Sequence, residues 1–93
     1  MQEYQRVRAD WGKDTVLLFK LGDFYEVFFD EAAEVAKILG IALTKRNEIP
    51  MCGIPYHCLD KWCRMLMAAG KGVAVSETTK GGGRVTRNWE HMV

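Results

Sequence analysis

The chain has 93 residues, of which 48% are hydrophobic, and this length allows one small domain with a modest core. Thirteen basic and twelve acidic residues leave a formal net charge of +1, which excludes a strong field for steering charged partners. Since free-standing DNA-binding domains are usually more basic, we expect any nucleic-acid role to be weak alone or shared with other parts of a larger chain.

The cysteines indicate a reducing environment. Cys52, Cys58 and Cys63 are odd in number, and neither a leader peptide nor a run apolar enough to span a bilayer is visible. We therefore expect a cytosolic setting without membrane contact. A metal site completed by His57 and His91 is the alternative. It is disfavoured because no C-x-x-C pair is present and the spacings match no zinc template.

The first part of the chain predicts one helix and two strands. Good helix formers predict a short helix over Gln2–Ala9. Apolar and aromatic strand formers lie on both sides of Gly22-Asp23. They predict two strands, Thr15–Leu21 and residues 23–29, that are joined by a tight connection.

The middle of the chain predicts a second helix followed by a third strand. Asp30 is expected to be the N-cap of a helix over residues 31–39, and Gly40 is expected to end it. The strand is expected over residues 41–44. Helical spacing predicts four buried positions in the helix, namely Ala32, Val35, Ala36 and Leu39.

The last part of the chain predicts a third helix and two more strands. Residues 51–54 lie between two prolines and must be extended or turned. A helix is expected over residues 57–69, strands over 73–78 and 85–93, and a turn at the three glycines 81–83. This order of elements predicts an α/β (α+β) fold, a single domain in which helices pack on a small mixed β-sheet. Because the chain stops inside an expected strand, we expect a domain excised from a larger protein, called the parent below.

Enzymatic chemistry is not expected within these residues. The glycines 81–83 lack the Gly-Lys-Ser/Thr ending of a phosphate-binding loop, which favours a hairpin turn. His57 and Cys58 are adjacent on an expected helix, so their side chains diverge and cannot form a nucleophile–base pair. No other nucleophile or metalloprotease motif is present in the sequence.

The predicted second strand combines aromatic and acidic residues on one face. Because side chains alternate along a strand, Phe24, Glu26 and Phe28 share a face, and Tyr25, Val27 and Phe29 share the other. Burying an unpaired carboxylate is costly, so we expect the face with Glu26 to lie at a sheet edge or to be exposed.

The pair Phe24 and Glu26 suits the recognition of a nucleic-acid base. An aromatic ring can wedge between stacked bases, and unstacking is easier at a mispaired base. A carboxylate can accept a hydrogen bond from a base edge, donate one if protonated, and repel phosphates at ordinary sites. The alternative is that Phe24 is a core residue and Glu26 a solvated strand residue.

Four blocks of sequence resemble the N-terminal mismatch-recognition domain of the MutS family of DNA mismatch-repair proteins. The blocks occur in the family's order and span nearly the whole chain. They are L-L-F-K-L-G-D-F-Y-E-V-F-F-D-E-A from Leu17, I-A-L-T-K-R from Ile41, I-P-M-C-G-I-P-Y-H from Ile49, and G-V-A-V-S-E from Gly72.

The resemblance implies a set of DNA-binding residues. Phe24 and Glu26 match the family's Phe-x-Glu motif, in which the ring stacks on a mispaired base and the carboxylate hydrogen-bonds it. Arg46 matches a backbone contact, and Met51 matches a loop that approaches the widened groove. The implied partner is double-stranded DNA with mismatches or small loops. The resemblance implies no cofactor in this chain, and it implies ATP, magnesium and a dimer for a bacterial, nucleoid-associated parent.

The chain also departs from the family pattern. Only Asn47-Glu48 separates Arg46 from Ile49, where the family has a longer loop containing glycine, so backbone contacts are expected to be fewer. Cys52 stands where alanine is usual, and the residues from Ser76 and from Asn88 also differ. The alternatives to mismatch binding are a related role in recombination and a protein-interaction module.

Overall fold

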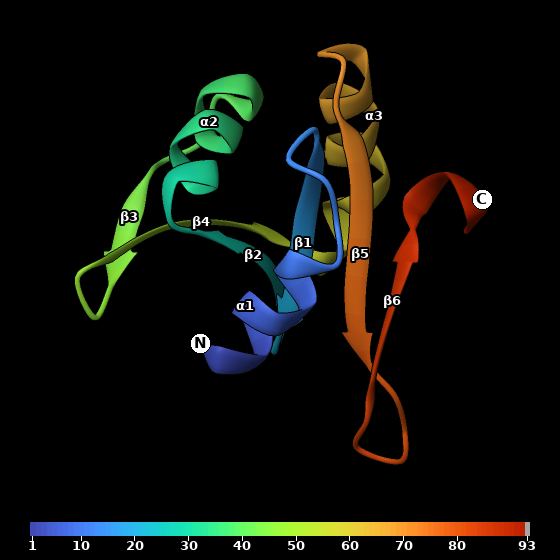
Figure 1. The fold of residues 1–93 in the computed structure, drawn as a ribbon. Coiled ribbons are helices and arrows are strands. Elements are labelled where there is room, and N and C mark those ends of the chain that lie inside the picture. Colours follow the sequence, from blue (N-terminus) through green and yellow to red (C-terminus); the bar gives the residue numbers. More distant parts are fainter. Residues whose placement is uncertain (93) are drawn as a thin grey trace.

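A computed structural model describes residues 1–92 of the chain. Within them, two strands follow each of the helices α1, α2 and α3 (Figure 1). The elements are α1 Gln2–Ala9, β1 Thr15–Leu21, β2 Phe24–Phe28, α2 Asp30–Leu39, β3 Thr44–Arg46, β4 Ile49–Pro55, α3 Leu59–Ala68, β5 Gly72–Thr78 and β6 Arg84–Asn88, with short 3-10 turns at Tyr56–Cys58 and Trp89–His91.

The strands form one mixed sheet in the order β3-β4-β2-β1-β5-β6. β1 and β5 run parallel at its centre, and every other neighbouring pair is antiparallel. The parallel pair requires a long crossover, which contains β2, α2, β3, β4 and α3. The predicted α+β fold with a small mixed sheet is therefore confirmed.

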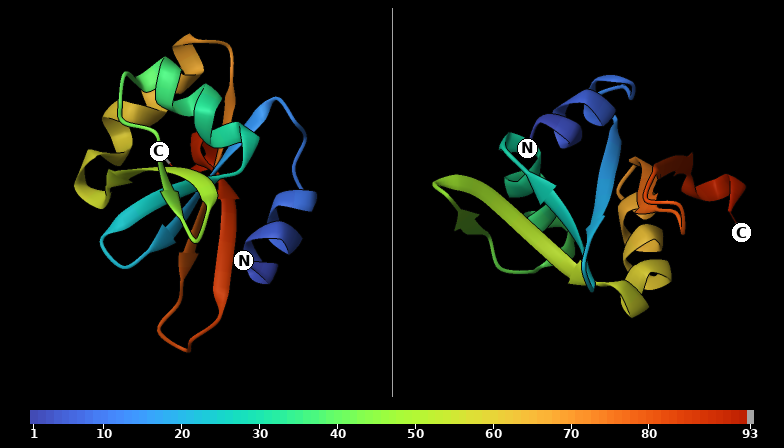
Figure 2. Two further views of the ribbon diagram at one scale, coloured as in Figure 1. Left: turned by 90° about the vertical axis from the view of Figure 1, so that its left-hand side faces the viewer. Right: turned by 90° about the horizontal axis from the view of Figure 1, so that it is seen from below.

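Helices cover both faces of the sheet. In the right-hand view of Figure 2, α1 and α3 lie on opposite sides of β1. The alternation along β1 explains how the strand serves both layers: Val16 and Leu18 join the larger cluster with α2 and α3, whereas Leu17 and Phe19 join a smaller cluster with α1. The face that α1 partly covers is called the α1 face below.

β2 lies inside the sheet, between β1 and β4. The expectation that the face with Glu26 lies at a sheet edge is therefore wrong. The expected exposure holds for part of that face, because Phe24 is exposed whereas Glu26 and Phe28 are buried. The predicted alternation of β2 is confirmed up to Phe28, which packs in the cluster on the α1 face while Tyr25 and Val27 pack in the larger cluster. It is wrong for Phe29, which lies beyond the end of β2 and packs against the cluster on the α1 face. Glu26 is itself buried, with 5% of its surface exposed, and so it needs a partner.

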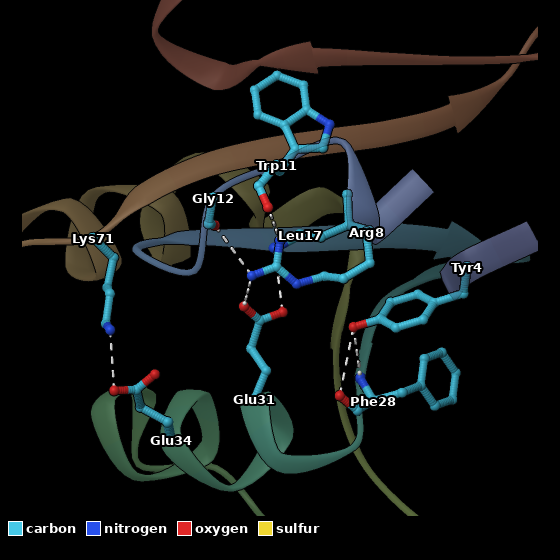
Figure 3. Close-up of polar contacts among 9 residues, drawn as sticks. All are labelled: Tyr4, Arg8, Trp11, Gly12, Leu17, Phe28, Glu31, Glu34 and Lys71. Atoms are coloured by element: carbon cyan, nitrogen blue, oxygen red, sulfur yellow. Dashed lines mark hydrogen bonds and ion pairs between the residues drawn. The ribbon is translucent and has the colours of Figure 1, made fainter. Parts of the chain in front are cut away.

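α1 is held by a tyrosine that packs on the sheet and by an ion pair to α2 (Figure 3). The Tyr4 ring packs edge-on against Phe19 and Phe28, with centroid distances of 5.4 and 5.0 Å. Its hydroxyl accepts a hydrogen bond from the backbone N–H of Phe28 at 3.3 Å. Arg8 pairs with Glu31 of α2 at 3.0 Å. These contacts anchor the end of β2, the strand that carries Phe24 and Glu26.

The third strand lies later than predicted. β3 spans Thr44–Arg46, so the expected strand over residues 41–44 is wrong except at its last residue. The reason is the tight turn that follows. Asn47 and Glu48 both have positive φ, at 51° and 66°, which makes a two-residue hairpin that pairs Arg46 with Ile49. The pairing starts at this turn and ends after three residue pairs.

Two helix starts also differ in detail. Asp30 is the first residue of α2 and not its N-cap, which is Phe29 at a φ of 64°. The third helix begins with the 3-10 turn Tyr56–Cys58 before α3 proper. The predicted buried face of α2 and the left-handed Gly40 at its end are confirmed.

The predicted last strand is too long. β6 ends at Asn88, whose side chain accepts a hydrogen bond from the backbone N–H of Glu90 and starts a 3-10 turn. That turn buries Trp89 in the larger cluster, which a straight strand would not do. The glycines 81–83 form the predicted turn between β5 and β6, and Val93 lies outside the described residues. Across residues 1–92, the helices are all too short or too polar to span a bilayer.

Replacing Tyr4 by Phe tests the anchor of α1. The buried N–H of Phe28 loses its hydroxyl acceptor while the ring packing stays, so the free energy of unfolding should fall by about 1 kcal/mol in urea titrations. Tyr56→Phe is the matched control, because Tyr56 is 52% exposed, and it should change little. Equal effects of the two variants would contradict the anchoring role.

Candidate functional site

A hollow of about 390 Å³ opens on the α1 face of the sheet, beyond the part that α1 covers. Residues of β2, β3 and β4 and one residue before β3 form its walls. All four site residues predicted from the sequence are among them. The lining residues are Phe24, Glu26, Ala42, Thr44, Arg46, Met51 and Gly53.

The strand register explains why residues so far apart in the sequence meet here. β2 and β4 pair antiparallel with Glu26 opposite Gly53 and Phe28 opposite Met51. β3 continues the sheet and places Thr44 opposite Met51. Residues that are directly opposite in an antiparallel pair project from the same face, so the three strands contribute to one surface.

Phe24 is the exposed member of this surface. It is the first residue of β2, directly after the tight turn at Gly22, and it pairs with Leu21 on one side and Pro55 on the other. Its exposed fraction is 45%, whereas the four residues that follow it in β2 are buried. The alternative in which Phe24 is core and Glu26 is solvated is therefore wrong for both residues.

Glu26 is buried and paired with Arg46. The guanidinium Nη1 lies 3.1 Å from one carboxylate oxygen, Oε1, and Nη2 donates a hydrogen bond to Oε2 at 3.2 Å. Within residues 1–92, Oε1 has this ion-pair contact but no hydrogen bond of good geometry. The arginine side chain is about half exposed, at 49%, so its other donors remain accessible from solvent. The arrangement leaves hydrogen-bonding capacity on both partners.

The surroundings of Glu26 raise its pKa above the usual value for a glutamate. Burial raises the pKa of this carboxyl, and the charge and the hydrogen bond of Arg46 oppose the rise without cancelling it. The side chain can thus accept a hydrogen bond as a carboxylate or donate one as an acid. The pKa is set by two elements of structure, the sheet that buries Glu26 and the β3–β4 hairpin that carries Arg46.

The remaining site residues differ in accessibility. Met51 is 9% exposed and packs with the cluster on the α1 face, so it forms part of the base of the hollow. Sequence reasoning did not identify Ala42, Thr44 or Gly53 as lining residues. For Thr44 and Gly53, the signal that could have found them is the register of β3, β4 and β2, which becomes clear only once the two-residue turn is recognised.

The cysteines and histidines form no second site within residues 1–92, where no group of three or more potential metal ligands gathers. Burial raises the pKa of the Cys52 thiol to about 11 and that of Cys63 to about 12, so both thiols are protonated and unreactive at neutral pH. His57 packs edge-on against Tyr56.

Comparisons with known proteins agree with the resemblance described above. Residues 1–90 match the family described as MutS domain I. Over 77 residues, the chain is 53% identical to the "DNA mismatch repair protein MutS" of Treponema denticola and 54% identical to that of Fervidobacterium nodosum. Each match covers 83% of this chain but only 8% and 9% of those proteins, respectively. The chain therefore corresponds to less than a tenth of the length of these two relatives.

Replacing Arg46 by Gln tests the pairing of the buried carboxyl. Without the guanidinium the pKa of Glu26 should rise further. A carboxyl with a raised pKa binds its proton more tightly in the folded state. The stability that the variant loses is therefore lost in full at pH values above the pKa of Glu26 in the folded state. The loss disappears as the pH falls toward the pKa of glutamate in the unfolded chain, about 4.

Urea unfolding at a series of pH values should thus show a deficit for Arg46→Gln that is largest near neutral pH and shrinks in acid. A carbon-13 NMR titration of Glu26 should give the higher pKa directly. Arg64→Gln removes the same charge from a solvent-exposed pair with Asp60 and should leave the pH dependence as in the wild type. A deficit for Arg46→Gln that grows in acid would contradict the pairing.

Proposed function

This chain belongs to the MutS domain I family, and we propose that it is the mismatch-recognition part of a DNA mismatch-repair protein. The observation that carries the proposal is the exposed Phe24 ring at the mouth of a hollow whose wall holds the buried carboxyl of Glu26. The relatives are named DNA mismatch repair proteins, and the match to this chain spans both residues.

Phe24 is proposed to act as a wedge from the minor groove. The phenyl ring would fill a base step that has opened and stack on a mispaired or unpaired base. Opening a sound duplex costs a few kcal/mol per base, and a mispaired base costs less. Because Phe24 begins a strand that is held by β1 and β4 on both sides, little order has to be gained when the ring is inserted.

Glu26 is proposed to test the base that the wedge displaces. Its carboxylate would accept a hydrogen bond from a base edge, and its protonated form, which burial favours, would donate one. Near an intact duplex the same group opposes binding, because it repels phosphates and would lose solvent without gaining a partner. Discrimination then comes from deformability and not from sequence.

Arg46 and Met51 are proposed to support this contact. The half-exposed guanidinium can reach a phosphate while it stays near Glu26, and Met51 shapes the base of the hollow. With a formal charge of +1, this chain has little electrostatic attraction for DNA. We therefore propose that most of the affinity comes from other parts of a longer protein.

For that longer protein we propose a dimeric ATPase that requires ATP and magnesium and acts in the bacterial cytoplasm on nucleoid DNA. No enzymatic step is assigned to residues of this chain. The proposal is consistent with the small share of each relative that the chain covers. A role in recombination, or as a protein-interaction module, would be favoured instead if the parent bound DNA without any preference for mispaired sites.

Phe24→Ala in the parent protein tests the wedge. Removing the ring should abolish most of the preference for a duplex with one mismatch over the matched duplex, since stacking on a base is worth about 1–3 kcal/mol. Equilibrium binding to the two duplexes at one salt concentration measures this preference. Val85→Ala is the control, because Val85 is also exposed but lies on β6, away from the hollow. A preference that survives Phe24→Ala would refute the wedge.

Glu26→Gln tests the carboxyl, because it keeps the size of the side chain and removes its charge. We expect tighter binding of the parent to the fully paired duplex, a smaller preference for the mismatch and a changed ranking of different mismatches. Glu90→Gln changes the net charge equally, on an exposed residue outside the hollow, and should not have these effects. Unchanged binding of the paired duplex by Glu26→Gln would exclude a repulsive role.

A further inference from the structure

We propose that Gly53 determines the specificity of the hollow, because the side chain it lacks leaves open the space in which a base edge meets Phe24 and Glu26. This inference rests on the proposed function and extends it to a residue that the function does not assign. Gly53 lies on β4, directly opposite Glu26 on β2, and is partly exposed in the wall of the hollow.

A glycine in the interior of a strand needs a reason, because it destabilises the strand relative to a residue with a side chain. One common reason is a backbone conformation that other residues avoid. Gly53 does not have it, since its φ is not positive. A second common reason is a β-bulge. The register of β2 with β4 continues without interruption through five residue pairs, so Gly53 marks no bulge.

Close packing is a third common reason for glycine, and it does not apply either. A Cβ built at Gly53 would lie 3.4 Å from the backbone oxygen of Tyr25, 3.5 Å from Cγ of Glu26 and 3.7 Å from Cδ2 of Phe24. All three distances are ordinary van der Waals contacts. Gly72 provides the contrast, because a Cβ there would meet the Thr15 hydroxyl at 3.0 Å. An alanine therefore fits at position 53 without displacing the sheet.

The remaining reason for a strand glycine is the close approach of a ligand. Two of the three neighbours of the added methyl group are side-chain atoms of the proposed wedge and the proposed base contact. On the same face of β4, Met51 and Pro55 flank Gly53 and both carry side chains. The absent side chain thus leaves a gap in that row opposite Glu26, beside the Phe24 ring.

The chemistry of the ligand follows from the walls of this gap. A planar group can stack on the Phe24 ring and present a polar edge to the Glu26 carboxyl only if the space above Gly53 is free. A displaced nucleobase has this combination of a flat face and a hydrogen-bonding edge. A methyl group at position 53 would occupy the space in which the base stacks on Phe24 and presents its polar edge to Glu26.

Gly53→Ala in the parent protein tests the inference. We expect the preference for a duplex with one G·T mismatch over the matched duplex to fall by about tenfold or more, within the range that loss of base stacking and of a hydrogen bond produces. Amide hydrogen exchange of β2 and β4 should stay as slow as in the wild type or become slower, since alanine favours the strand over glycine. Gly81→Ala is the matched control, because a Cβ at that exposed turn residue meets nothing within 4 Å, and it should leave the preference unchanged.

Three results would overturn the inference. They are a wild-type preference in Gly53→Ala, an equal loss in Gly81→Ala, and a loss accompanied by faster exchange in β2 and β4, which would mean that the methyl group disrupts the sheet. Phe24→Ala, measured alongside, separates this inference from the proposed function. If Phe24→Ala loses the preference and Gly53→Ala keeps it, the inference fails and the function stands. If Phe24→Ala keeps the preference, the function itself fails.

Discussion

The burial of one carboxyl group on an interior strand is the constraint on which the rest of this site depends. Glu26 has β1 on one side and β4 on the other, so it cannot turn toward solvent at a sheet edge. Its partner Arg46 comes from β3, a strand of three residues at the edge of the sheet. The ion pair therefore connects the short hairpin to the interior across β4. Removing either partner would leave the other uncompensated, and for the buried carboxyl this is the more costly case.

The two faces of the sheet are covered unequally. β1 and most of β2 need apolar cover on two sides, which α2 and α3 supply on one face and the small helix α1 on the other. α1 extends only over the part of its face that contains Phe19 and Phe28, where Tyr4 anchors it. The surface around Phe24 is left open. An exposed aromatic ring on a rigid strand, next to a buried acid, is the kind of preorganised site that binding requires.

The sequence predicted the local elements well and the contacts between strands poorly. Helix propensity was sufficient for α1 and a run of strand formers was sufficient for β1, and the bounds of both agree with the prediction. The position of β3 depends on a turn with two positive φ angles at Asn47 and Glu48. Asparagine favours this conformation, but glutamate in place of the usual glycine makes the turn hard to recognise. The pairing of Glu26 with Arg46 needs the order of three strands, which local patterns do not contain. For the same reason, the sequence does not distinguish Gly53 from the other glycines. Its position opposite Glu26 follows only from the pairing of β2 with β4.

The nearly neutral charge of the chain and the acid in its hollow suit a domain that discriminates between sites while other parts of the parent supply the affinity. A strongly basic domain would bind every phosphate backbone alike, so its affinity would mask the smaller energy that distinguishes a mispaired base. In the proposed function, a hollow with a buried carboxyl gains little from an intact duplex, because the carboxylate would repel phosphates and would find no base edge. If other parts of the parent supply the affinity, as we propose, the contribution of this chain can be almost entirely discriminatory. Such a site is favoured by an open space beside the ring and the acid, and a glycine at position 53 leaves that space open.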